Sequence, residues 1–93
     1  MRESEIEAYL VKRVTALGGV VRKVRWIGRR GAPDRVVMLP PRRAWRPALI
    51  WVELKATGEP PSTGQLDEHA EMRAVGQRVE VIDSIEGVDK LLA

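Results

Sequence analysis

Two carboxylates and one ammonium group stand at the ends of two apolar segments of this 93-residue chain. Asp34 precedes the run "RVVML", while Glu53 and Lys55 follow the run "ALIWV". A charge at the end of a buried segment is costly to desolvate unless it has a partner or a bound ion. Two carboxylates with a backbone carbonyl suit Mg²⁺ or Mn²⁺, and a lysine beside them can orient water or neutralise charge on a phosphate. The spacing alone favours a simpler interpretation, a surface aspartate and an ordinary Glu–Lys neighbour pair.

An antiparallel hairpin would bring these three residues together. Residues 34–40 ("DRVVMLP") and 48–56 ("ALIWVELKA") are predicted strands, joined by a connection that contains "RRAWRP". If the two strands pair, Asp34 at the start of the first meets Glu53 near the end of the second. Glu53 and Lys55 point to the same side, because residues two apart on a strand share a face. The two carboxylates and the ammonium group are therefore expected at one end of the sheet.

The remaining pattern predicts an α/β fold with a mixed central sheet flanked by helices, in the order α-β-β-β-α-β-α. Helices are expected at residues 4–17, 63–76 and 84–92, and two further strands at 20–26 and 77–83. The strand–helix–strand unit from Ile50 to Ile82 indicates a right-handed parallel crossover. The sheet should therefore combine an antiparallel hairpin with a parallel pair.

Polar residues at the predicted helix starts indicate how each helix begins. Ser4 and Glu7 have the spacing of a capping box. Ser62 and Ser84 are expected to cap the second and third helices through their hydroxyl groups. Within the second helix, Leu66 is expected to face the sheet.

Length and composition limit the class of protein. A chain of 93 residues is expected to form a single domain, residues 1–93, with a modest core. The absence of cysteine removes disulfides, a cysteine-based zinc site and a thiol nucleophile. The charged start "MRESEIEAYL" does not resemble a signal peptide, and no apolar run approaches the ~20 residues of a membrane span. We therefore expect a soluble, intracellular, cytoplasmic protein without a membrane partner.

The positive charge is concentrated in the middle of the chain. Nine of the 16 basic residues lie between Arg22 and Arg46, together with one acid, Asp34, whereas the other segments hold seven basic and twelve acidic residues. A basic middle on an otherwise acidic chain indicates a polyanion such as nucleic acid as the partner. A well-solvated arginine-rich hairpin would give the same composition.

Several segments together resemble one nuclease family. The dipeptide "PD" at Pro33-Asp34, followed by "ELK" at residues 53–55, is similar to the PD-(D/E)xK nuclease signature. With "GRRGAPDRVVMLP", "IWVELKATG", "PSTGQLDEH" and "AVGQRVEVIDSIEGVDKLL", residues 4–92 resemble a stand-alone VRR-NUC domain, the virus-type replication-repair nuclease. This resemblance implies a restriction-endonuclease-like fold and metal-dependent hydrolysis of phosphodiesters. A phage or prophage origin would fit the family name.

The resemblance also assigns roles to residues of this chain. It implies that Asp34 and Glu53 bind Mg²⁺ or Mn²⁺ together with the backbone carbonyl of Leu54, and that Lys55 is the catalytic lysine. It places Gln65 near the active site, where this side chain could touch the lysine, a water molecule or a phosphate.

The family also uses a glutamate on the first helix, as a further catalytic and metal-binding group. Glu3, Glu5 and Glu7 compete for this place. Glu7 is expected to serve, because its spacing from Leu10 and Val14 puts it on the core-facing side. The alternative is that Glu7 is only the acid of the predicted capping box.

Other residues near the motifs are candidates for binding roles. His69 lies four residues after Gln65 and therefore on the same helical face, where it could join the site or be structural. Trp45 is expected to be exposed among arginines, where it would anchor a dimer partner or stack on a base. Arginines beside Asp34 and in the hairpin connection are expected to hold DNA phosphates, which position a protein without specifying sequence; they are Arg29, Arg30, Arg35, Arg42 and Arg43. Each of the three near Asp34 could instead pair with surface acids.

Taken together, the sequence predicts a metal-dependent endonuclease that acts on DNA. By resemblance, the substrate is branched DNA such as a Holliday junction, recognised by shape, and the enzyme is a homodimer whose two-fold axis suits such a junction. Two alternatives remain open at this point. One is a module that binds branched or single-stranded nucleic acid without cutting it, and the other is a nuclease that acts on RNA.

Overall fold

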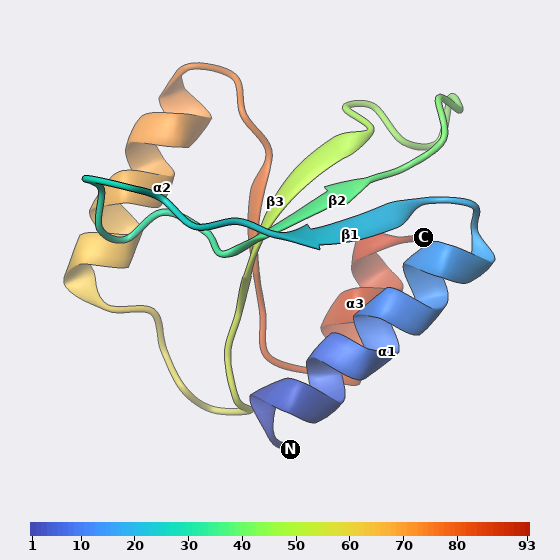
Figure 1. Ribbon diagram of the computed structural model, residues 1–93, viewed down its shortest axis with the longest axis horizontal. Coiled ribbons are helices and arrows are strands. Elements are labelled where there is room, and N and C mark those ends of the chain that lie inside the picture. The colour runs from blue at the N-terminus through green and yellow to red at the C-terminus, as the bar shows by residue number, and fades with distance from the viewer.

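The computed structural model describes all 93 residues, which form one four-stranded sheet and three helices (Figure 1). Along the chain these are α1 (Glu3–Ala16), β1 (Val20–Lys23), β2 (Arg35–Met38), β3 (Leu49–Leu54), α2 (Thr63–Ala74), β4 (Val79–Ile82) and α3 (Ile85–Leu91). The order α-β-β-β-α-β-α agrees with the prediction. None of the three helices has the length and apolar character that crossing a membrane requires.

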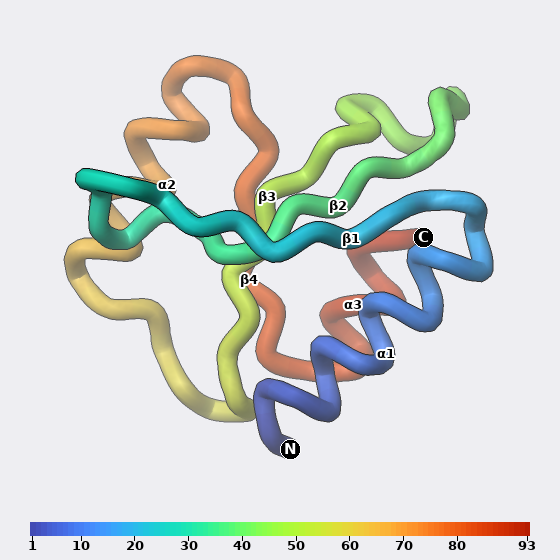
Figure 2. Tube along the Cα trace, in the orientation of Figure 1, coloured from blue at the N-terminus to red at the C-terminus, as the bar shows by residue number.

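The sheet has the strand order β1-β2-β3-β4, which can be followed along the chain in Figure 2. Strand β2 pairs antiparallel with both β1 and β3, whereas β3 and β4 are parallel and are joined through α2. In the β2–β3 hairpin, Arg35 lies opposite Val52. One further step along both strands places Asp34 opposite Glu53, so the pairing required to join the two acids is confirmed.

Helices α1 and α3 cover one face of the sheet and enclose the core (Figure 1). Alternate residues of β3 point into it, because successive side chains of a strand face opposite sides; Ile50, Val52 and Leu54 are fully buried. α1 contributes Ile6, Leu10 and Val14, which share one helical stripe and are also fully buried. The residues between these β3 positions, including Glu53, consequently point to the opposite face of the sheet.

Helix α2 lies on that opposite face, beside β4. The prediction that Leu66 faces the sheet is wrong, since its side chain is 53% exposed. The buried residues of α2 are instead Glu68 and His69. The reason is that this helix packs beside the charged end of β3, where Glu53 points, so its inner surface is polar.

The ends of several elements differ from the expected ones. α1 begins at Glu3, one residue early, with Arg2 at the N-cap position and no side-chain cap, so the capping box of Ser4 and Glu7 is wrong. Strand β1 ends at Lys23 rather than residue 26, and the other strands are also shorter than expected. The predicted caps of the other two helices are confirmed. Ser62 accepts a hydrogen bond from the backbone amide of Gln65, and Ser84 accepts one from that of Gly87.

Trp45 is not the exposed aromatic that the sequence predicts. Only 5% of its surface is exposed, and it belongs to the core cluster, at the end where the connection between β2 and β3 folds back. The exposed guanidinium of Arg42 lies over its ring, 5.2 Å from the centroid. A core of this small size recruits the indole for its apolar area, so Trp45 is available neither to a base nor to a dimer partner.

Candidate active site

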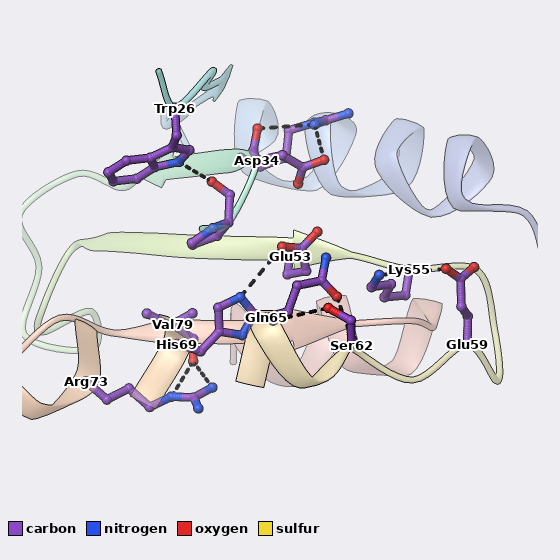
Figure 3. A network of polar contacts seen from close by, with 12 residues as sticks. Trp26, Asp34, Glu53, Lys55, Glu59, Ser62, Gln65, His69, Arg73 and Val79 are labelled. Atoms are coloured by element: carbon purple, nitrogen blue, oxygen red, sulfur yellow. Dashed lines mark hydrogen bonds and ion pairs between the residues drawn. The ribbon is translucent and has the colours of Figure 1, made fainter. Parts of the chain in front are cut away.

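Asp34 and Glu53 form an acid pair at the end of the β2–β3 hairpin, on the face that α2 flanks (Figure 3). Asp34 directly precedes β2, and Glu53 is the second-last residue of β3. One carboxylate oxygen of each, Oδ1 of Asp34 and Oε1 of Glu53, is buried without a hydrogen-bond partner. Buried polar atoms are nearly always paired in folded proteins. Two unpaired oxygens at one place therefore mark a position that a ligand would complete.

The environment of Glu53 opposes its ionisation. Burial raises the pKa of this carboxyl group to about 7, and the charge of Asp34 acts in the same direction. The ammonium group of Lys55 works against both effects by lowering the same pKa. Such a perturbed carboxyl group, beside a second one, is typical of functional sites.

Lys55 lies at the edge of the acid pair, directly after β3. Its backbone amide donates a 3.0 Å hydrogen bond to the carbonyl of Ile82, which extends the β3–β4 pairing and fixes the direction of the side chain. The ammonium nitrogen lies 3.7 Å from Oε1 of Glu59, and the side chain is largely buried (Figure 3). The structure thus brings Asp34, Glu53 and Lys55 to one place, as their spacing predicts.

Arg35 contacts the acid pair from the α1 side of the sheet, and its side chain is buried. Its guanidinium donates hydrogen bonds to the carboxylate of Glu7 and lies 2.9 Å from Oδ2 of Asp34. With 8% of the residue exposed, it is not available as the DNA contact that the sequence predicts. The alternation of β2 explains this, because Arg35 points to the α1 side of the sheet, where an acid must neutralise it.

The three glutamates of α1 have different partners. Glu5 pairs with Arg2 at the surface, and Glu7 is held by Arg35. Glu7 reaches the acid pair through Arg35, because the same guanidinium also contacts Asp34. A direct metal-binding role for Glu7 stays a prediction. Glu3 takes part in no ion pair, and its charge contributes to the raised pKa of Glu53.

Two polar residues of α2 border the acid pair. Gln65 completes a capping box, because its side-chain oxygen accepts a hydrogen bond from the amide of Ser62. His69 is fully buried, and its Nε2 atom lies 3.6 Å from Oε1 of Glu53 (Figure 3). Burial and the charge of Arg73 lower the pKa of His69, so its imidazole is neutral at pH 7. Both residues lie near the site as expected, with His69 directly facing Glu53.

The remaining predicted phosphate contacts fall into two groups. Arg29 is paired, since its guanidinium contacts Glu68 at 2.5 Å and Glu71 at 2.7 Å. Arg30, Arg42 and Arg43 are exposed and take part in no ion pair. The last two lie in the connection between β2 and β3, at the opposite end of the hairpin from Asp34. They could reach only a ligand that extends along the sheet.

The acids that hold the arginine-rich segment were not predicted from the sequence. Glu68 and Glu71 are three residues apart on α2, a spacing that places them on one helical face. The hydrogen bond from Arg29, together with its charge, in turn lowers the pKa of Glu68. The sequence did contain a signal for this contact, namely two acids on one helical face and an arginine-rich loop. Only the fold shows that the loop and the helix meet.

The donor set fits a small hard cation. The acid pair offers two carboxylates with unpaired buried oxygens, and the carbonyl of Leu54 is adjacent in the chain. Oxygen donors of this kind suit Mg²⁺ or Mn²⁺. No group of three or more His, Cys, Asp or Glu side chains forms a ready-made cage. A cation here would consequently complete its coordination with backbone oxygen, water or a phosphate, as Mg²⁺ commonly does.

The one pocket of the molecule lies away from the acid pair. It is a hollow between the edge strand β4 and α3, lined by residues that include Arg78, Glu80 and Lys90. At the acid pair there is no pocket; Glu53 is buried, and the side chain of Asp34 is 40% exposed. A site without an enclosing pocket suits an extended ligand such as a polynucleotide backbone better than a small molecule.

Comparison with known proteins agrees with the fold. An aspartate at the start of one strand, paired with a Glu-x-Lys motif on its neighbour, is the arrangement of the PD-(D/E)xK nucleases. A solved structure of a VRR-NUC domain superposes with a TM-score of 0.82, with 41% sequence identity, over 97% of this chain and 92% of that one. A protein named "Putative nuclease p44", from Acyrthosiphon pisum secondary endosymbiont phage 1, is 46% identical over 84 residues, which are 90% of this chain and 85% of the relative. No family model matches the chain.

The chain belongs to the VRR-NUC family of nucleases. The predicted fold class, an α/β restriction-endonuclease-like fold with a mixed sheet, is thereby confirmed.

Proposed function

We propose that this protein is a metal-dependent endonuclease that hydrolyses phosphodiester bonds of DNA at the acid pair. The observation that carries the proposal is the meeting of Asp34, Glu53 and Lys55, with an unpaired buried oxygen on each acid. A family member that only bound nucleic acid would have no need to keep all three. Membership of the VRR-NUC family supports the same activity.

Asp34 and Glu53, with the carbonyl of Leu54, would hold Mg²⁺ or Mn²⁺. When bound there, such an ion lowers the pKa of a water molecule and polarises a phosphate oxygen. Its positive charge would also stabilise the ionised form of Glu53, whose pKa is raised by burial and by Asp34. A cation between the two acids would account for both features, because it would stabilise the ionised form of Glu53 and would bind the unpaired oxygens.

The other residues of the site would position the reactants. Lys55 places its ammonium group beside the acids, where it orients the attacking water or neutralises charge developing on the phosphate. Arg35 holds Asp34 in place through Oδ2 and leaves Oδ1 free. Gln65, at the first turn of α2, lies where its amide group can contact water or phosphate. His69 lies 3.6 Å from Oε1 of Glu53 and limits the rotation of this carboxylate.

Glu3 is the first-helix acid that we assign to the site in place of Glu7. It is free of ion pairs, and its charge reaches Glu53, whereas Glu7 is bound by Arg35.

We expect Glu3→Gln to weaken Mn²⁺ binding and cleavage by about tenfold, the effect of removing one outer carboxylate from a metal site. Glu5→Gln is the matched control, because Glu5 pairs only with Arg2 at the surface. Equal effects of Glu3→Gln and Glu5→Gln would contradict this assignment.

Branched DNA such as a Holliday junction is the substrate we propose, cut by a homodimer. The support is the family resemblance, together with exposed arginines at both ends of the β2–β3 hairpin, which would follow a backbone rather than read bases. A two-fold dimer would present two acid pairs to strands related by the same symmetry.

The test is a cleavage assay with a panel of labelled substrates. A four-way junction, linear duplex, single-stranded DNA and an RNA of matched sequence are incubated at one stated salt concentration with Mg²⁺, Mn²⁺ or EDTA. We expect cutting of the junction with either metal, and none with EDTA. Preferential cutting of RNA would favour a ribonuclease, and binding without cutting under every condition would favour a non-cleaving module.

A further inference from the structure

The loop from Trp26 to Pro33, which we call the Trp26–Pro33 loop, is closed at its base beside the acid pair. The indole nitrogen of Trp26 donates a 2.7 Å hydrogen bond to the carbonyl oxygen of Pro33 (Figure 3). Pro33 is buried, and the next residue is Asp34. The Trp26 ring also packs against Trp51 of β3, with 5.3 Å between centroids. Both ends of the loop are therefore fixed against the sheet, next to the proposed metal site.

The far side of the loop is fastened to α2. Arg29 forms its ion pairs with Glu68 and Glu71 of that helix. Gly31 approaches so closely that a Cβ atom on it would lie 2.5 Å from the carbonyl oxygen of Gly64. The loop is thus held by two ion pairs, a close backbone contact and the hydrogen bond at its base. A loop held at so many points presents its exposed side chains in fixed positions.

One exposed residue of the loop, directly after Trp26, is an isoleucine in open solvent. Ile27 is 94% exposed, more than any other large hydrophobic side chain of the protein. At the adjacent Gly28, a Cβ atom would meet nothing within 4 Å. Ile27 therefore adds nothing to the core, and a small polar residue would serve the loop equally well unless the side chain has an external contact.

The charges around Ile27 indicate the chemistry of that contact. Arg25 and Arg30 flank it in sequence, are exposed and take part in no ion pair. Free arginines attract a polyanion and would repel the same loop of a second copy. An exposed apolar side chain between two free arginines fits a nucleic acid, whose charged backbone encloses an apolar stack of bases.

We propose that Ile27 is a wedge that inserts between bases at an opened step of the DNA, beside the phosphate that lies at Asp34. Apolar side chains used in this way unstack a base step and open the duplex. Arg25 and Arg30 hold the phosphates on either side. The wedge selects DNA that is already unstacked, because the cost of opening is then smallest. This inference rests on the proposed nuclease function and adds the residue that selects the site of cutting.

The test measures base unstacking directly. A four-way junction carries 2-aminopurine at the branch point, and binding is followed in the Asp34→Asn background, in which the strands stay intact. We expect a rise in 2-aminopurine fluorescence on binding, and its loss with Ile27→Ala. The ratio of junction affinity to linear-duplex affinity should fall about tenfold, as expected for the loss of one base contact. Ile27→Leu should restore both signals.

The control is Val11→Ala, which shortens an exposed side chain on α1, on the other face of the sheet. It should leave the fluorescence and the affinity ratio within twofold. The inference is overturned if Ile27→Ala also leaves both unchanged, or if this variant changes the sedimentation coefficient of the free protein, which would make Ile27 a contact between copies. If Ile27→Ala has no effect while the wild type cuts DNA, only the proposed role of Ile27 is overturned, and the nuclease function stands. If the wild type neither binds nor cuts DNA, the proposed function fails with it.

Discussion

Glu53 is the residue at which folding and function conflict most directly. Its position on β3 buries the carboxyl group beside Asp34, and both effects raise its pKa to about 7. A protein selected only for stability would place a neutral side chain there. The retained carboxylate is understandable if a cation neutralises it in the working enzyme.

We predict that Glu53→Gln stabilises the metal-free protein at pH 8 by about 1–3 kcal/mol, because a tenfold change in the proton affinity of a group corresponds to about 1.4 kcal/mol. The folded-state pKa lies above the ordinary value of 4.5. The contribution of the protonated group to stability is therefore present below pH 4.5 and is lost as the pH rises through about 7. At pH 5 the variant and the wild type should be almost equally stable.

Chemical denaturation of both proteins in EDTA at pH 5 and pH 8 measures this difference. Asp67→Asn, an exposed residue of α2, is the control and should change stability by less than about 0.5 kcal/mol at either pH. A destabilising effect of Glu53→Gln at pH 8 would show that the carboxylate is already neutralised within the protein.

At this residue scale, the sequence predicted the meeting of Asp34, Glu53 and Lys55, because strand alternation and hairpin pairing depend only on local pattern. It could not predict the partner of Arg35. That partner, Glu7, lies 28 residues earlier in the chain, and its position depends on how α1 crosses the sheet.

At the scale of elements, the contact between α2 and the Trp26–Pro33 loop decides how the arginine-rich segment is presented. Gly31 has a backbone φ of +82° and meets the backbone of Gly64. Glycine is required there for two reasons, since a side chain would be strained in this conformation and would collide with a carbonyl oxygen that cannot move away.

We predict that Gly31→Ala destabilises the protein by about 3 kcal/mol or more, with about 1–2 kcal/mol from the left-handed backbone and the rest from the collision. Gly28→Ala is a matched control, because Gly28 has a similar φ of +74° but open space around it. It should cost about 1 kcal/mol. Urea denaturation of both variants provides the comparison, and equal losses would show that the loop does not press against α2.

Element types and their order could be predicted from periodicity and from turn residues, and the caps at Ser62 and Ser84 from local chemistry. The failures have a common cause. Leu66 was assigned from its own hydrophobicity and Trp45 from the arginines around it, but burial depends on which neighbouring element has apolar surface to offer. Leu66 faces solvent because α2 packs on a polar end of the sheet, and Trp45 is buried because the core is small.

For the whole molecule, the uneven charge distribution extends beyond the acid pair. Arg30 lies in the loop beside the site, while Arg42 and Arg43 lie at the far end of the β2–β3 hairpin. A DNA arm that contacts both groups must run along the sheet. The binding free energy of such an arm should depend strongly on salt, because each neutralised phosphate releases counterions.

We predict that the double variant Arg42→Ala/Arg43→Ala binds a four-way junction with a weaker salt dependence. The slope of log K against log[salt] should fall in magnitude by about 2, close to 0.9 for each lost phosphate contact. Fluorescence anisotropy over a salt series measures this slope. Lys12→Ala, an exposed lysine of α1 on the other face of the sheet, should leave it unchanged. An unchanged slope in the double variant would mean that DNA does not reach this end of the molecule.

The measurement that tests the central claim most directly is the single-turnover cleavage rate of a labelled four-way junction in Mg²⁺, with binding followed in parallel. We predict that Asp34→Asn and Lys55→Ala each lower the rate at least about a hundredfold, the usual effect of removing one group that stabilises the transition state, while junction affinity changes little. Glu86→Gln, an exposed acid on α3, should cut at the wild-type rate. Cleavage that persists in both site variants, with their fold intact, would contradict the assignment of the acid pair and Lys55 as the active site.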